Sequence, residues 1–237
     1  MARLNDPRAV AREYSSEAGL QARRSLYETV DGPDVKQELF RAVLGRAPEH
    51  VLEVGPGTGE LAAKLITAGI TDYQVIDISP RMVELARERG ITAQVADIQA
   101  LPFADRAFDC VVAAWMLYHV PDLHRGLAEV ARVLRPGGCL IATTNSERHL
   151  SELWALADQE RWELPFTAEN GAGALRRHFA AVEAMAVEAW VTVADAEAVR
   201  SYISRSPSRS HLASRVGDLP GPLRTGARAC IFIANKA

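Results

Sequence analysis

The sequence is poor in cysteine. Its three cysteines, Cys110, Cys139 and Cys230, each lie in an apolar run typical of a strand, and no Cys-x-x-Cys pair occurs. Such cysteines are usually buried free thiols, so we expect no disulfide framework. The six histidines lack the spacing of metal ligands, and we predict no zinc or iron site.

Three further features are missing from the chain. The net charge is −3 and the pI is about 6.1, so there is no basic excess and we expect no nucleic-acid partner. No apolar run reaches the roughly 18 residues that a membrane helix needs, so we predict no membrane span. Residues 1–12 are polar and carry acids as well as bases. They do not resemble a signal peptide, and we expect a cytoplasmic protein.

The chain does have the composition of a globular domain. It has 237 residues, of which 48% are hydrophobic and 24% charged, which fits a single domain with a sizeable core. Residues 1–47 predict two or three helices, broken at the turn 31–34. From residue 50 strands alternate with helices, which is typical of parallel strands joined by crossover helices. We predict strands at 50–54, 73–77, 92–96, 108–114 and 139–144, and helices at 60–68, 80–89 and 123–134.

The remainder of the chain is less regular. Apolar periodicity predicts helices at 147–160 and 172–178, and an aspartate cap starts another at 195–204. Residues 181–193 predict a strand with an interruption near 189. Residues 205–226 are rich in Ser, Arg, Pro and Gly, which is typical of an exposed, mobile loop, and 230–234 predict a final strand.

The most informative segment is the glycine turn at residues 51–61, which follows the first strand of the alternating pattern. Gly55, Gly57 and Gly59 recur at every second position. Glycines at a strand-to-helix junction let a ligand approach the backbone, and the helix that follows offers free N–H groups. The pattern therefore predicts a cradle for a nucleotide-type cofactor.

The details of this turn disfavour a dinucleotide. The dinucleotide fingerprint places its third glycine where this chain has Glu60. Pro56 removes one N–H donor, and Glu53 adds a second negative charge beside the turn. A pyrophosphate needs many donors and little negative charge, so the turn favours a ligand that carries positive groups.

Two acids at the ends of the next strands agree with this interpretation. Asp77 follows Gly59 by 18 residues, at the position where an acid accepts hydrogen bonds from ribose hydroxyls. Asp97 ends the third strand, where its carboxylate can accept from an adenine amino group, and the apolar Ile98 and Met82 can sandwich the ring. All these positions fall at the carboxyl edge of the predicted parallel strands, where ligands bind in open sheets.

Residues 50 to 146 resemble a class I S-adenosylmethionine (SAM)-dependent methyltransferase of the small-molecule type. The matching segments are residues 51–61, 75–82, 97–103 with 108–109, and 128–138. The resemblance implies an α/β fold: a Rossmann-like seven-stranded sheet, mostly parallel with the last strand antiparallel, helices on both faces and an N-terminal helical cap. It also divides a single domain into a helical cap at 1–47, a SAM-binding core at 48–146, and roof helices with final strands at 147–237.

The resemblance implies a set of cofactor-binding residues. The glycine turn would surround the methionine part of SAM, Asp77 would bind the ribose, and Asp97 with Ile98 would bind the adenine. Tyr14 matches a position that closes over SAM in such enzymes. The full predicted set is Tyr14, Glu53, Gly55, Pro56, Gly57, Gly59, Asp77, Ile78, Met82, Asp97, Ile98 and Ala114.

Catalysis leaves weaker signals in the sequence. His119 follows the fourth strand and faces the expected cleft, where it is either a general base or a structural histidine. His149 and Glu152 are spaced to share one face of a predicted helix, as an oriented base pair or as a solvated helix start. Trp115 and Trp154, with Tyr118, either line an aromatic pocket or belong to the core. His119 and His149 are the predicted catalytic residues.

The sequence therefore predicts an enzyme that moves a methyl group from SAM to a small organic acceptor, with secondary metabolism as one setting. The alternatives are a non-catalytic SAM-binding module and a nicotinamide-dinucleotide oxidoreductase. A nucleic-acid methyltransferase is disfavoured because the chain has neither an Asn/Asp-Pro-Pro-Tyr/Phe run nor a Pro-Cys turn. The acceptor atom, whether oxygen, nitrogen or carbon, and the oligomeric state have no signature in the chain.

Overall fold

The computed structural model describes residues 25–27, 30–158, 164–205 and 209–237. Tyr14 and the helices expected within residues 1–24 lie outside this part of the chain. Within the expected helical cap, the described residues form a 3₁₀ turn at Ser25–Tyr27, a short strand β1 at Val30–Asp31 and helix α3 at Val35–Leu44. The break expected at 31–34 therefore lies directly before α3.

The described strands form one sheet in the order β1-β7-β8-β6-β5-β2-β3-β4. Strands β2 to β6 pair in parallel, while β8 runs antiparallel between β6 and β7. The mostly parallel sheet with an antiparallel last strand is confirmed, and β1 adds an eighth strand through two residues that pair with β7. The bounds are β2 His50–Val54, β3 Asp72–Asp77, β4 Thr92–Val95, β5 Phe108–Ala114, β6 Leu134–Asn145, β7 Ala181–Val193 and β8 Leu223–Asn235.

The helices begin at the caps that the sequence indicates. Ser79 caps α5, with Pro80 at the first helical position, and the Asp195 carboxylate accepts a backbone N–H at the start of α9. The described α-helices that follow α3, including α5 and α9, are α4 Glu60–Thr67, α5 Pro80–Glu88, α6 Leu123–Val133, α7 Ser151–Ala155, α8 Gly171–Leu175 and α9 Ala196–Ser204. Further 3₁₀ turns lie at Ile98–Ala100, Leu117–His119 and Ser210–Arg215.

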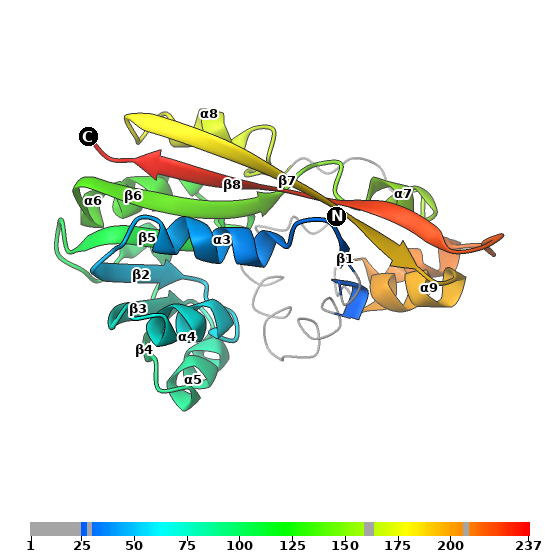
Figure 1. Cartoon of the computed structure of the whole chain (residues 1–237), viewed down its shortest axis with the longest axis horizontal. Coiled ribbons are helices and arrows are strands. Elements are labelled where there is room, and N and C mark those ends of the chain that lie inside the picture. The colour runs from blue at the N-terminus through cyan, green and yellow to red at the C-terminus, as the bar shows by residue number, and fades with distance from the viewer. Residues whose placement is uncertain (1–24, 28–29, 159–163, 206–208) are drawn as a thin grey trace.

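Alternate residues of the central strands face two separate cores. Val51 packs with apolar residues of α3, α4 and α5, whereas Leu52 packs with those of α6 and α8. Helices therefore cover both faces of the sheet, as expected. A third apolar cluster joins α7, α9 and the end of β7. In Figure 1, β7 and β8 project beyond the parallel strands, and α7 and α9 lie along that projection, away from α4 and α5.

The second half of the chain differs from its predicted elements in three ways. The helix expected at 147–160 is only the five-residue α7, and β7 is continuous rather than interrupted. The segment expected to be a loop at 205–226 contains a 3₁₀ turn and the first residues of β8. β8 begins at Leu223 because residues 223–229 pair with 187–193 of β7. The sequence around residue 223 gives no signal of this pairing with a distant strand.

Candidate functional site

A cavity of about 1450 Å³ opens at the carboxyl ends of the parallel strands. The chain order of the strands reverses between β2 and β5, and open α/β sheets bind their ligands at such a point. The cavity is larger than the roughly 300–1,000 Å³ of a typical ligand pocket. It therefore has room for two molecules, and we describe it as two halves.

The first part is the glycine-turn half, formed by the residues after β2, β3 and β4. Gly55, Gly57 and Gly59 all have positive φ angles, of 67°, 56° and 74°. Gly55 and Gly57 line the cavity. A Cβ on Gly55 would lie 3.0 Å from the Cβ of Met116, whereas a Cβ on Gly57 would meet none of the described residues within 4 Å. The backbone at Gly57 is therefore open to a ligand.

Gly59 serves the fold rather than the cavity wall. It precedes α4 in the left-handed conformation and is not among the described lining residues. A Cβ there would lie 3.0 Å from the Cδ1 of Ile91. The third glycine thus lets α4 pack closely against the start of β4.

Two acids of this half have raised pKa values: Glu53 is buried and Asp77 is half-buried. Burial raises the pKa of Glu53 to about 7, while a hydrogen bond from Tyr73 opposes the shift and the charge of Asp77 adds to it. The Tyr73 hydroxyl donates to the Glu53 carboxylate at 2.9 Å. Burial also raises the pKa of Asp77 to about 6, although the Ser79 N–H donates to it at 2.8 Å. A ligand with positive or hydroxyl groups would relieve this desolvation.

Of the residues expected at the adenine, Ile78 and Ile98 line the cavity and Met82 does not. Ile78 is 56% exposed and Ile98 is buried, and both line the cavity. Met82 is fully buried and does not appear among the described lining residues, so it supports the wall from within the core. The carboxylate of Asp97 accepts the backbone N–H of Gln99 at 2.8 Å and faces the cavity from the start of a 3₁₀ turn.

The residues after β5 connect the two halves. Ala114 and Trp115 line the cavity, and Trp115 has a φ of 53° that few non-glycine residues adopt. Its indole N–H donates to Asn145 at the end of β6 at 2.9 Å. His119 also lines the cavity, with its ring centroid 4.5 Å from that of Tyr118. Together with Pro56, every predicted cofactor or catalytic residue in the described chain lines the cavity, except Gly59 and Met82.

The second part of the cavity is the roof half. Its floor is apolar and built of small side chains from β7 and β8, and its walls carry the rings of α7 and α9. These positions belong to no sequence motif, and most of them are not predicted from the sequence. The described residues of this half include Tyr27, Asn145, His149, Trp154, Leu164, Val187, Ala189, Tyr202, Arg209, Ala227 and Ala229. Gly32 and Asp34 line the cavity next to them, and a Cβ on Gly32 would lie 3.1 Å from Ala189.

His149 lies in the loop before α7, with protein atoms around both ring nitrogens. Its Nε2 is 2.7 Å from the Tyr27 hydroxyl, and its Nδ1 is 3.0 Å from both the backbone N and O of Arg228. Burial lowers the pKa of His149 to about 4, helped by the positive charges of Arg209 and Arg228. The ring is therefore neutral near pH 7.

The expected pairing of His149 with Glu152 on one helix face is wrong. α7 begins at Ser151, after Leu150 in the left-handed conformation, so His149 is outside the helix. Glu152 turns instead toward β8, where it accepts from the Thr225 hydroxyl at 2.8 Å and from the Gly226 N–H at 3.0 Å. Although burial acts in the opposite direction, these hydrogen bonds and that from Arg228 lower the pKa of Glu152 to about 2.

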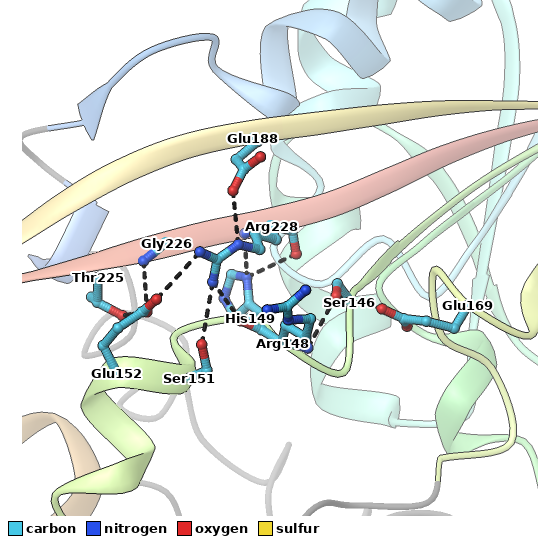
Figure 2. Close-up of polar contacts among 10 residues, drawn as sticks. All are labelled: Ser146, Arg148, His149, Ser151, Glu152, Glu169, Glu188, Thr225, Gly226 and Arg228. Atoms are coloured by element: carbon cyan, nitrogen blue, oxygen red, sulfur yellow. Dashed lines mark hydrogen bonds and ion pairs between the residues drawn. The ribbon is translucent and has the colours of Figure 1, made fainter.

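Figure 2 shows how the Arg228 side chain ties the loop before α7 to the sheet. The guanidinium lies 2.8 Å from a Glu188 oxygen and 3.2 Å from a Glu152 oxygen. It also donates to the Arg148 carbonyl at 2.8 Å and to the Ser151 hydroxyl at 3.3 Å. The loop that carries His149 is therefore fixed by one arginine of β8.

Two features are absent from the described part of the chain: a metal-binding cluster and a membrane-spanning helix. That part of the chain has no group of three or more His, Cys, Asp or Glu side chains that could hold a metal ion. Its helices are all too short or too polar to cross a membrane.

Residues 52–142 match the model of the methyltransferase domain family. The same region is similar to the O-methyltransferase cnsE of Penicillium expansum, at 44% identity over 39% of this chain and 37% of that protein. It is also similar to the ubiquinone/menaquinone biosynthesis C-methyltransferase UbiE of Marinomonas, at 36% identity over 50% of this chain and 51% of that protein. The chain thus spans about half or less of the length of these relatives.

The fold has solved counterparts over nearly the whole chain. The crystal structure of the [4+2]-cyclase SpnF aligns with a TM-score of 0.61, covering 96% of this chain and 94% of that one at 21% identity. Similarity at this identity concerns the fold alone. It extends the architectural match to the roof half, which the family model does not reach.

Proposed function

We propose that this chain, whose residues 52–142 match the methyltransferase domain family, is a class I SAM-dependent enzyme that transfers a methyl group from SAM to a small organic acceptor. The observation that carries the proposal is the pair of desolvated acids beside the glycine turn. Glu53 and Asp77 both have raised pKa values because burial leaves their charged forms poorly solvated. A cationic, hydroxyl-rich ligand supplies what both carboxylates lack.

The geometry of the glycine-turn half fits SAM. Gly55, Pro56 and Gly57 line the part of the cavity next to Glu53, where the methionine portion would lie. Asp77 would accept from the ribose hydroxyls. The adenine would lie against Ile78, Asp97, Ile98 and Ala114. Gly59 and Met82 would support this site through packing, while the role of Tyr14 stays a prediction.

SAM would supply an activated methyl carbon, so the chain mainly has to align the acceptor, exclude water and remove a proton where needed. We place the proton acceptor at His119, which lines the cavity beside the residues after β5. His149 suits this role less well, because its ring nitrogens face Tyr27 and the Arg228 backbone and its pKa is about 4. We infer that His149 positions Tyr27 instead.

Calorimetric titration of the purified chain with SAM, S-adenosylhomocysteine and NAD tests the cofactor. We expect both adenosyl ligands to bind and NAD to give no signal. Replacing Asp77→Asn should weaken SAM binding at least about tenfold, because a hydrogen bond to a charged group contributes roughly 1.5–3 kcal/mol. Binding of NAD without SAM would instead support a nicotinamide-dependent oxidoreductase, which the family match does not favour.

Incubating the enzyme with labelled SAM and a cell extract, followed by mass spectrometry, would identify the acceptor. With that acceptor, His119→Ala should reduce kcat by about 10²-fold or more, as for loss of a general base, while SAM affinity stays the same. His149→Ala should change KM for the acceptor more than kcat. If no extract yields a labelled product although SAM binds, the alternative of a non-catalytic SAM-binding module gains support.

A further inference from the structure

The amide side chain of Asn145 lies where the two halves of the cavity meet. Asn145 ends β6 and lines the cavity. It pairs in register with Ala229 of β8, on the floor of the roof half, and its side chain contacts Trp115, which follows β5. A methyl group that passes from a donor in the glycine-turn half to an acceptor in the roof half would therefore cross beside this side chain.

Trp115 fixes the orientation of the Asn145 amide. The indole N–H can only donate a hydrogen bond, so the atom that it meets at 2.9 Å is the amide oxygen, Oδ1. Trp115 has a φ of 53°, which is a strained conformation for a bulky residue, and its backbone N–H donates to the Thr143 carbonyl at 2.8 Å. The fold thus holds the indole against the amide oxygen in spite of this local strain.

The amide nitrogen of Asn145 keeps its N–H donors for a ligand. No described residue accepts a hydrogen bond from Nδ2, and the one side-chain hydrogen bond of Asn145 in the described chain is that from Trp115 to Oδ1. Nδ2 is also absent from the buried side-chain atoms that lack a partner in the described chain, so it is open to solvent. Since Oδ1 is already bonded to the indole, this side chain offers the cavity a pair of neutral N–H donors.

Net charge does not choose between acceptors in this cavity. Its described lining carries both signs, including Asp34 and Lys36 in the segment beside Ala189 of β7. The neutral donors of Asn145 instead distinguish nucleophiles by their lone pairs. An oxygen nucleophile can accept an N–H with one lone pair and attack the methyl carbon with another. A neutral amine has a single lone pair, which the attack itself uses, and a carbon nucleophile has none to spare.

We propose that Asn145 binds the reacting oxygen of the acceptor, and that this oxygen belongs to a hydroxyl group that can ionise, such as that of a phenol. The inference deepens the proposed function and rests on it. The acceptor oxygen forms a bond to the methyl carbon, the carbon–sulfur bond breaks with its electron pair left on sulfur, and the hydroxyl proton leaves to His119, the proposed base. The N–H donors of Asn145 hold the oxygen between the two halves and stabilise its negative charge.

A phenol whose absorbance reports its ionisation, 4-nitrophenol, tests the contact on the full chain. The absorbance is titrated against pH with the protein in excess, with and without saturating S-adenosylhomocysteine. Because donors on the oxygen stabilise the ionised phenol, Asn145→Ala should raise the pKa of the bound phenol by at least about one pH unit, as for loss of a hydrogen bond to a charged group. Trp115→Phe lets the amide turn, and should raise this pKa by less.

Asn235→Ala is the matched control. Asn235 is half-buried like Asn145, but it lies at the end of β8 that pairs with Cys139 and is not among the described lining residues. This variant should leave the titration of the bound phenol as in the wild type. An unchanged titration in Asn145→Ala would overturn the proposal. So would failure of the wild type to bind 4-nitrophenol.

A measurement on the wild type covers the case in which Asn145→Ala does not fold. The product from the cell extract is made with SAM that carries ¹³C in its methyl group, and the ¹³C chemical shift of the transferred methyl identifies the atom to which it is bound. We expect a methyl on oxygen, and a methyl on nitrogen or carbon would overturn the inference.

The two experiments separate this inference from the proposed function. Failure of S-adenosylhomocysteine to bind would count against the methyl-donor assignment, while the titration of 4-nitrophenol on the unliganded chain would still report on Asn145. Normal binding of S-adenosylhomocysteine with a titration that Asn145→Ala leaves unchanged would keep the methyl-donor assignment intact and overturn the role of Asn145 alone.

Discussion

A glutamate in the glycine-turn half and a glutamate beside the roof half have pKa values shifted in opposite directions. In the glycine-turn half, Glu53 is 2% exposed and receives a hydrogen bond from Tyr73, and burial raises its pKa to about 7. Beside the roof half, Glu152 receives hydrogen bonds from Thr225, Gly226 and Arg228, and its pKa falls to about 2. The charged form of Glu53 is therefore poorly solvated, whereas that of Glu152 is stabilised by hydrogen bonds and by Arg228.

This difference separates a binding site from a scaffold. A buried acid without enough hydrogen-bond donors destabilises the unliganded protein. Such an acid is typical of a functional site, where a bound ligand compensates for the desolvation. An acid with all its donors in place holds elements together instead. By this criterion we expect Glu53 and Asp77 to belong to a ligand site, whereas Glu152 and Arg228 form the frame that holds the loop of His149.

The largest expected effect concerns the pH dependence set by Glu53. Because the folded pKa of Glu53, about 7, lies above the ordinary glutamate value of 4.5, the folded state binds more protons than the unfolded state between these pH values. The free energy of unfolding contributed by Glu53 is therefore fully present below pH 4.5 and is lost as pH rises toward 7. We expect a loss of roughly 2–3 kcal/mol across this window, measured by urea unfolding of the unliganded chain.

Glu53→Gln is the matched variant, since its side chain has the same size and no charge to lose. Its stability should vary much less between pH 4.5 and 7, with the part due to Asp77 remaining because that pKa is also raised, to about 6. Saturating SAM should flatten the wild-type profile as well. An unliganded wild-type protein that gains stability between pH 5 and 7 would contradict the picture of an undersupplied acid.

A smaller effect is expected from adding a methyl group to the glycine turn. Gly55→Ala and Gly57→Ala both place an alanine at positive φ, which costs about 1–2 kcal/mol. The Gly55 variant adds a contact, because its Cβ would lie 3.0 Å from that of Met116. We expect it to lose about 1 kcal/mol more stability than the Gly57 variant, by urea unfolding.

Relative to its loss of stability, Gly57→Ala should lose more SAM affinity than Gly55→Ala. Among the described residues, no atom lies within 4 Å of a Cβ at Gly57, a residue that lines the cavity. Gly57→Ala should therefore weaken SAM binding with little extra loss of fold stability. If Gly57→Ala bound SAM as tightly as the wild type, the ligand would not approach this part of the backbone.

The comparison also explains which parts of the molecule the sequence predicts. The glycine-turn half is local: Gly55, Asp77 and Asp97 each end a strand of the alternating pattern, and topology brings strand ends to one edge. Caps such as Ser79 and Asp195 mark helix starts through contacts within three residues. Short-range signals of this kind can be recognised in a single chain.

The roof half depends on contacts between distant segments. His149 meets Tyr27 across 122 positions and Arg228 across 79, so both contacts join segments that are distant in the sequence. Residues 223–229 look like part of a loop because Arg, Thr and Gly interrupt the apolar pattern, yet Arg224 and Arg228 lie over Trp190 of β7. Neither the start of β8 nor the position of Arg209 has a local signal.

The smallest expected effect comes from Glu152→Gln, and its pH dependence has the opposite sign to that of Glu53. Because the folded pKa of Glu152 is about 2 and the ordinary glutamate value is 4.5, the stability that Glu152 contributes is present above pH 4.5 and is lost as pH falls toward 2. The amide keeps the shape but loses the charge that faces Arg228, so we expect a loss of about 1 kcal/mol at pH 7. The side chain is 36% exposed, and solvent screening limits the effect.

Two measurements on Glu152→Gln together test the comparison: the free energy of unfolding and the affinity for SAM. Urea unfolding should show the difference from wild type shrinking between pH 4.5 and 3, while calorimetry at pH 7.5 should give SAM affinity within about twofold of wild type, since additivity holds between distant sites. If SAM affinity fell as far as it does in Asp77→Asn, the two halves would be energetically coupled. The frame around His149 would then also set the shape of the glycine-turn half, and the two acids would no longer report on separate sites.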